Sequence, residues 1–124
     1  MEGPSPAGVG LMPAALALAA LLGLACVGFG AFGAHGVADP KAQEWLRTGA
    51  FYGFVHVLAV FAADRYGARL APPLYLFGVL VFSGSLFAMA LGAPRWLGAI
   101  TPIGGVSFMA GWAALAWAVA RRQT

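Results

Sequence analysis

Residues 11–32 form an apolar run that contains no charged side chain. An α-helix rises about 1.5 Å per residue, so about 20 apolar residues are needed to cross a bilayer, and this run supplies them. Only Glu2 carries a charge before the run, whereas a secretory signal peptide would need basic residues there. We therefore predict a retained transmembrane helix, preceded by a disordered tail at residues 1–10 that is rich in proline and glycine.

The composition of the whole chain extends this interpretation to an integral membrane protein. Of the 124 residues, 61% are hydrophobic and only 9% are charged, whereas a soluble domain carries about 25% charged residues to wet its surface. A soluble fold with so few charges would leave large apolar areas in contact with water, and a lipid bilayer removes that cost. Because lipid cannot satisfy open backbone groups, the spans must be α-helices.

Three further apolar segments predict three more transmembrane helices. Asp39 and Pro40 mark the start of the first of these, since aspartate caps free N–H groups and proline suits the first helical position. The connecting loops are short, which favours antiparallel neighbours. The predicted fold is an all-α, up-down-up-down four-helix transmembrane bundle, a single domain at residues 11–122 with helices at about 11–32, 40–63, 72–91 and 101–120.

The basic residues lie at the ends of the predicted helices. The net charge is +3, but the seven Lys and Arg residues form no stripe or cluster, so a nucleic-acid partner is not expected. Four of them lie at the end of the bundle that holds both termini, namely Arg65, Arg69, Arg121 and Arg122. The other three lie at the opposite end, namely Lys41, Arg47 and Arg95. The excess favours termini in the cytoplasm and a multi-pass protein of the cell membrane.

Glycine recurs on the predicted helices at spacings that permit close packing. Gly49 and Gly53 form a GxxxG pair, by which membrane helices approach each other closely. Residues 28–33 also match the GxGxxG pattern of dinucleotide-binding folds, but that pattern has mechanical meaning only between a strand and a helix. The glycines that we expect to pack against neighbouring helices are Gly28, Gly33, Gly49, Gly53, Gly84, Gly104 and Gly111.

His56 is the sharpest candidate for a functional residue. It shares one face of its predicted helix with Gly49 and Tyr52, and we expect that face to point toward other helices. An ionisable group inside a membrane helix is a candidate functional residue, but a neutral histidine also serves as a structural hydrogen-bonding group between helices. The partners expected for such a bond are Ser83, Ser85, Ser107 and Tyr52.

His35 is predicted at a membrane interface, where it either bonds loop carbonyls at a helix end or acts as a ligand or proton-exchange group. Joint ligation of a haem iron by His35 and His56 is not expected, because His56 lies some two turns deeper. Two histidines with no nearby cysteine also fall short of a zinc site. Proton transport would require an acidic residue inside a span. All four acidic residues lie outside the predicted spans, since Glu44 precedes the membrane-spanning part of the helix at 40–63, which we place at Thr48–Ala63. We expect no catalytic residue, metal or cofactor.

Four motifs along the chain resemble those of a known family. They are GAFGAH at 30–35, W-x-x-TG-x-x-Y-x-x-x-H at 45–56, FSGSLF at 82–87 and TPIGGVSFMAGW at 101–112. In this order they resemble the domain of unknown function 423 family, which includes the transmembrane protein 256-like proteins. The resemblance implies a small four-helix membrane protein with no established reaction. Position 53 is glycine where the family is associated with a polar residue such as glutamine, which implies a thinner polar network around Tyr52.

Two hypotheses on function follow from these observations. In the first, the protein is a non-enzymatic membrane component or accessory subunit that assembles with itself or with a larger membrane complex through small-residue helix faces. In the second, it binds a small lipid or quinone-like molecule beside His56 and Tyr52.

Overall fold

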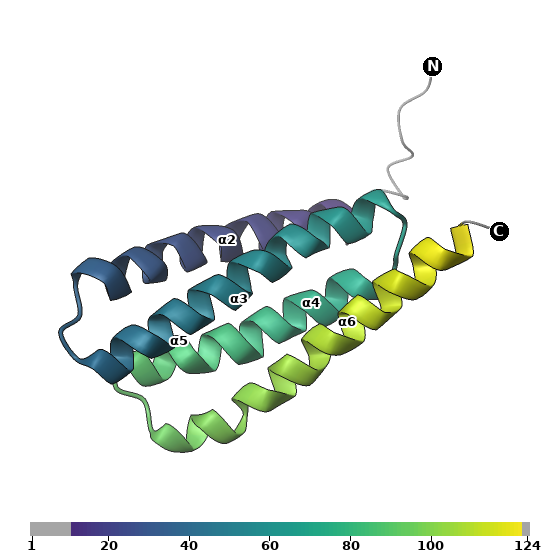
Figure 1. Ribbon diagram of the computed structural model, residues 1–124. Helices are drawn as coiled ribbons and strands as arrows, with labels where there is room; N and C mark the ends of the chain where they lie inside the picture. Colours follow the sequence, from purple (N-terminus) through teal and green to yellow (C-terminus); the bar gives the residue numbers. More distant parts are fainter. Residues whose placement is uncertain (1–10, 123–124) are drawn as a thin grey trace.

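The computed structural model describes residues 11–122, in which four helical segments lie side by side (Figure 1). The first two are α2, Leu11–His35, and α3, Pro40–Arg65. The fourth is α6, Thr101–Arg122, preceded by a short 3₁₀ helix, η2, Arg95–Ala99. All four segments are long and apolar enough to cross a membrane, and the described residues contain no strand. The predicted all-α transmembrane fold is thereby confirmed.

The third segment is continuous but changes its helical form in the middle. It begins as α4, Ala71–Gly78, passes through a π-helix, η1, Val79–Ser83, and ends as α5, Gly84–Ala90. A π-helix forms i→i+5 hydrogen bonds and occurs frequently at functional sites. The apolar pattern predicts one helix over 72–91 and contains no signal for this wide turn.

The start of α3 follows from its first residues. The Asp39 side chain accepts a hydrogen bond from the backbone N–H of Ala42 at 3.0 Å, which satisfies one of the free donors of the first turn. Pro40 occupies the first turn, where its missing N–H costs nothing. The Gln43 side chain donates to the Val37 carbonyl at 2.6 Å and so fastens the preceding loop to the helix.

The helices pack in chain order. The first segment, α2, packs mainly on α3, while α3 also packs on α4, η1 and α5, and α6 packs mainly on α4 and η1. The connections lie at alternate ends of the bundle, so the start of α2 and the end of α6 lie toward the same end (Figure 1). Side chains join α6 to α3, with His56 of α3 in contact with Phe108 and Trp112 of α6.

Glycines provide the closest approaches between the helices. A Cβ atom added to Gly49 would lie 2.7 Å from the Phe87 ring, and one added to Gly53 would lie 2.5 Å from the Cys26 sulfur. Comparable contacts within 3 Å would form at Gly33, Gly104 and Gly111. An added Cβ at Gly28 or Gly84 would meet nothing within 4 Å.

The outer surface of the bundle is apolar along its length. Leu24, Phe51, Val106 and Met109 each expose more than half of their surface. A soluble monomer rarely exposes contiguous apolar patches of this kind. Lipid tails are the solvent that matches such a surface, in agreement with the low fraction of charged residues.

Candidate functional site

His56 is buried in the middle of α3, and both nitrogens of its ring are hydrogen-bonded. Trp112 on α6 donates its Nε1–H to His56 Nε2 at 3.0 Å. Because an indole nitrogen can only donate, Nε2 must be unprotonated. The proton therefore lies on Nδ1, which donates to the Tyr52 carbonyl oxygen at 2.6 Å. This pair of bonds defines a neutral histidine with one tautomer.

Aromatic rings enclose the imidazole of His56. The Phe108 ring stacks on it with centroids 3.6 Å apart and planes 8° apart. The rings of Tyr75 and Trp112 lie at 5.7 Å and 5.9 Å. Phe108 and Trp112 are four residues apart on α6, so both point to the same side of that helix. We call His56, Phe108 and Trp112 the aromatic cluster; it joins α3 to α6.

Tyr75 lies behind the aromatic cluster, fully buried. Its ring meets the Trp112 ring at 5.3 Å and packs against the backbone at Gly111. Its hydroxyl has no hydrogen-bond partner in the described part of the chain. Tyr75 therefore contributes bulk that supports the indole from the inner side.

The three serines that we expected as partners of His56 bond to other groups. Ser83 donates to the Gly49 carbonyl at 2.7 Å, and Ser107 donates to the Leu74 carbonyl at 2.7 Å. Ser85 and Thr101 share a hydrogen bond of 2.5 Å between their hydroxyls. These bonds join the third segment to α3 and α6. Each also satisfies a hydroxyl that would have no hydrogen-bond partner in lipid.

Of the expected partners Ser83, Ser85, Ser107 and Tyr52, only Tyr52 bonds to His56, through its backbone carbonyl. The other bond comes from Trp112, which sequence reasoning did not select as a partner. The chemistry of tryptophan could have pointed to this role, because an indole carries an N–H donor on a large apolar ring and usually finds a hydrogen-bond partner when it is buried. Its motif, TPIGGVSFMAGW, also holds Phe108, which stacks on His56, and Ser107, which bonds to the Leu74 carbonyl.

His35 lies apart from this arrangement. It is exposed in the last turn of α2, and its side chain forms no hydrogen bond with another described residue. Within residues 11–122, no group of three or more His, Cys, Asp or Glu side chains is close enough to hold a metal ion.

A groove of about 740 Å³ runs beside the aromatic cluster on the side where α3 faces α6. The exposed faces of Tyr52 and Trp112, each 44% accessible, open it to the surroundings. Its lining is mostly apolar and includes four aromatic rings, those of Tyr52, Phe82, Phe108 and Trp112. No charged side chain lines it.

Two hydroxyl groups are the free hydrogen-bond donors of this groove. Thr48 and Tyr52 lie four residues apart on α3, and neither hydroxyl is bonded to another described residue. His56 has no nitrogen to spare, because Trp112 and the Tyr52 carbonyl occupy both. The groove thus offers an apolar, aromatic surface with two donors, while His56 fixes the orientation of Trp112.

Comparisons with known proteins agree with the membrane assignment. The chain is 44% identical over 111 residues to a UPF0382 membrane protein of Haemophilus influenzae, which covers 82% of this chain and 90% of that protein. It is 38% identical over 108 residues to the UPF0382 inner membrane protein YgdD of Escherichia coli K12, which covers 79% of this chain and 82% of that protein. The UPF0382 membrane protein YwdK of Bacillus subtilis is 38% identical to it over 107 residues, which covers 77% of this chain and 86% of that protein.

The chain also matches a family model over residues 29–105, a range that contains α3, the third segment and the start of α6. The family is described as a protein of unknown function (DUF423). No solved structure gives a significant match. The extent of the family match and the identity to these membrane proteins show that the chain belongs to the DUF423 family.

Proposed function

We propose that this protein is a non-enzymatic component of the cytoplasmic membrane that binds a small lipid or quinone-like molecule in the groove beside Tyr52 and His56. The observation that best supports this function is the pair of unbonded hydroxyls, Thr48 and Tyr52, in an otherwise apolar groove. A hydroxyl without a partner is costly in an apolar medium. A ligand oxygen in the groove would relieve that cost.

The shape and chemistry of the groove define the class of ligand. Its volume of about 740 Å³ lies within the range of about 300–1,000 Å³ that is usual for ligand sites. The rings of Phe82, Phe108 and Trp112 favour a flat or apolar body, and the hydroxyls favour a carbonyl oxygen as acceptor. A quinone head or a lipid ester meets both conditions, and a charged ligand would find no counter-charge.

His56 acts in this proposal as a positioning residue. Its bond to Trp112 and its stacking on Phe108 hold two walls of the groove in place. Since neither nitrogen is free to accept or deliver a proton, the arrangement supports binding rather than acid–base catalysis. The serines Ser83, Ser85 and Ser107 bond to carbonyls or to Thr101 and not to a histidine, which supports the same conclusion.

We expect Tyr52→Phe to weaken binding of a short-chain quinone about 2- to 13-fold, because one lost hydrogen bond costs about 0.5–1.5 kcal/mol. Quenching of tryptophan fluorescence in detergent micelles measures this, since Trp112 lines the groove. Tyr66→Phe is the matched control, because Tyr66 directly follows the last residue of α3 and lies outside the groove. The proposal fails if the unaltered protein shows no saturable quenching, or if both variants bind equally well.

Assembly with itself or with a larger membrane complex is a second candidate function. It is favoured by the outer face of α2, where Gly28 meets open space and Leu24 and Val27 are exposed. Mass spectrometry after gentle purification separates the two functions. A partner chain at fixed stoichiometry with no small molecule would support assembly and contradict ligand binding, whereas one bound small molecule per chain would support the groove.

We infer that both termini face the cytoplasm, from the excess of basic residues at their end of the bundle. With Cys26 replaced by alanine, a cysteine introduced beside Arg122 should resist a membrane-impermeant maleimide in sealed cells and react after lysis. A cysteine in place of the exposed Ala38, in the loop at the opposite end, should react in sealed cells. The reverse labelling pattern would invert the orientation.

A further inference from the structure

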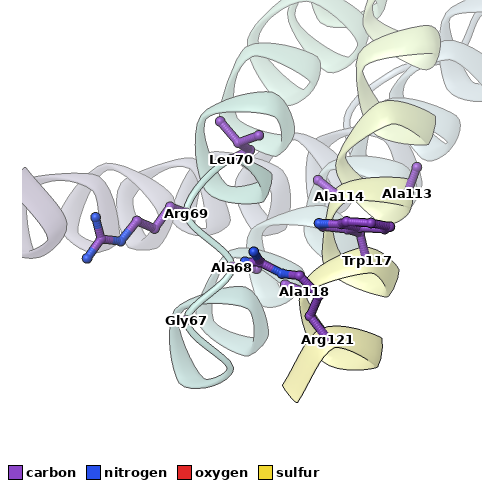
Figure 2. A pocket seen from close by; sticks show the side chains of 9 residues that line it. All are labelled: Gly67, Ala68, Arg69, Leu70, Ala113, Ala114, Trp117, Ala118 and Arg121. Atoms are coloured by element: carbon purple, nitrogen blue, oxygen red, sulfur yellow. The ribbon is translucent and has the colours of Figure 1, made fainter. Parts of the chain in front are cut away.

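A second pocket, of about 460 Å³, lies at the end of the bundle where α3 connects to α4 (Figure 2). The connecting loop contributes Ala68 and Arg69 to it, and the last turns of α6 contribute Ala114, Trp117 and Arg121. No residue of this pocket lines the groove beside His56.

Positive charge accumulates around this pocket. Among the described residues, this end of the bundle has four basic side chains and one acidic one, namely Arg65, Arg69, Arg121 and Arg122 against Asp64. The opposite end has three basic side chains, Lys41, Arg47 and Arg95, and two acidic ones, Asp39 and Glu44. There, Lys41 pairs with Glu44 at 3.3 Å. The local excess of positive charge is thus three at the pocket end and one at the other.

Apolar surface adjoins these charges. Leu70 is 71% exposed and Trp117 is 67% exposed, and an exposed tryptophan at a helix end is typical of the membrane interface. In Figure 2 the Trp117 ring lies beside Ala114, while the Arg121 side chain extends from α6 toward the loop at Ala68. The pocket therefore presents cations next to an apolar wall, which is the pattern of an amphiphilic ligand with an anionic head.

We propose that this pocket binds an anionic phospholipid, with its phosphate at Arg69 and Arg121 and an acyl chain along Ala114 and Trp117. Guanidinium groups bind phosphate oxygens through paired, charge-assisted hydrogen bonds. Basic pockets between membrane helices select acidic headgroups over zwitterionic ones by charge. In Figure 2 the Arg69 side chain is directed away from Arg121. Because it is exposed on the loop, a change of rotamer would bring its guanidinium to a headgroup at the rim.

Native mass spectrometry of the full-length protein in micelles tests the proposal. Phosphatidylglycerol and phosphatidylcholine with the same acyl chains are the probes, and we expect the anionic lipid to bind on the order of tenfold more tightly. The double variant Arg69→Gln with Arg121→Gln should lose this preference. Equal binding of the two lipids by the unaltered protein would overturn the proposal without any variant.

The double variant Arg47→Gln with Arg95→Gln is the matched control, since it removes the same charge from the opposite end of the bundle. It should keep the preference for phosphatidylglycerol, and an equal loss in both double variants would reduce the effect to net charge and contradict a defined pocket. Displacement of the lipid by inorganic phosphate alone would show a site for free phosphate instead. Tyr52→Phe should bind phosphatidylglycerol normally, so this test fails or succeeds independently of the proposed groove ligand.

Discussion

Gly104→Ala is expected to destabilise the bundle by about 3 kcal/mol, the upper range for overpacking a close contact. The new Cβ would lie 2.5 Å from the backbone nitrogen of Phe82 and 2.9 Å from the carbonyl oxygen of Gly78. Both are backbone atoms, so no change of rotamer relieves the clash and α6 must move away from η1. The same movement would stretch the bond from Ser107 to the Leu74 carbonyl.

Gly105→Ala is the natural control for this prediction. It makes the same chemical change one residue further along α6, where an added Cβ meets nothing within 4 Å. Alanine also has the higher helix propensity, so this variant should be neutral or more stable by up to about 1 kcal/mol. Equilibrium unfolding in mixed micelles compares the two, and equal stabilities would contradict the close contact between α6 and η1.

His56→Leu is expected to destabilise the protein by about 2 kcal/mol or more. Leucine removes the acceptor of the Trp112 N–H, and a buried donor left without a partner costs about 1–3 kcal/mol. It also removes the stacking on Phe108. The fluorescence spectrum of Trp112 should shift, because the indole is no longer held in one orientation.

His35→Leu provides the comparison at the other histidine. The His35 side chain is exposed and forms no hydrogen bond with a described residue, so its replacement should change the stability by less than about 0.5 kcal/mol. A double-mutant cycle of His56→Leu and Trp112→Phe should give a coupling energy of about 1 kcal/mol. Additive effects in that cycle would show that the hydrogen bond between the two rings contributes nothing.

The number and class of the helices could be predicted because they depend on local properties of the chain. The uncharged run at residues 11–32 satisfies the length that a bilayer requires, and the Asp39 cap fixes the start of α3. Which glycines are in close contact could not be predicted. Gly104 and Gly105 are neighbours of the same type on one helix, and only the position of η1 makes the first crowded and the second open.

The partner of His56 was beyond sequence reasoning for a related reason. Trp112 is 56 residues away, and its indole reaches the imidazole only because α6 packs on the third segment at one particular angle and register. The serines were equally plausible donors by their chemistry. What decided between them is that Ser83 and Ser107 face backbone carbonyls of neighbouring helices.

The wide turn at Val79–Ser83 makes the length of the third span critical to the groove. Each residue of a regular helix advances the chain by about 100° around its axis. Removing one residue from an ordinary helix would rotate one half against the other by about that angle, but this wide turn holds one residue more than an α-helical turn. Its removal would therefore restore an ordinary helix and keep the two halves of the span aligned. The residues that remain in the turn would change position, so Phe82 would shift in the groove wall and the bond from Ser83 to the Gly49 carbonyl would be disturbed. Among relatives, a one-residue gap at this point would therefore mark a differently shaped cleft, even where every lining side chain is the same.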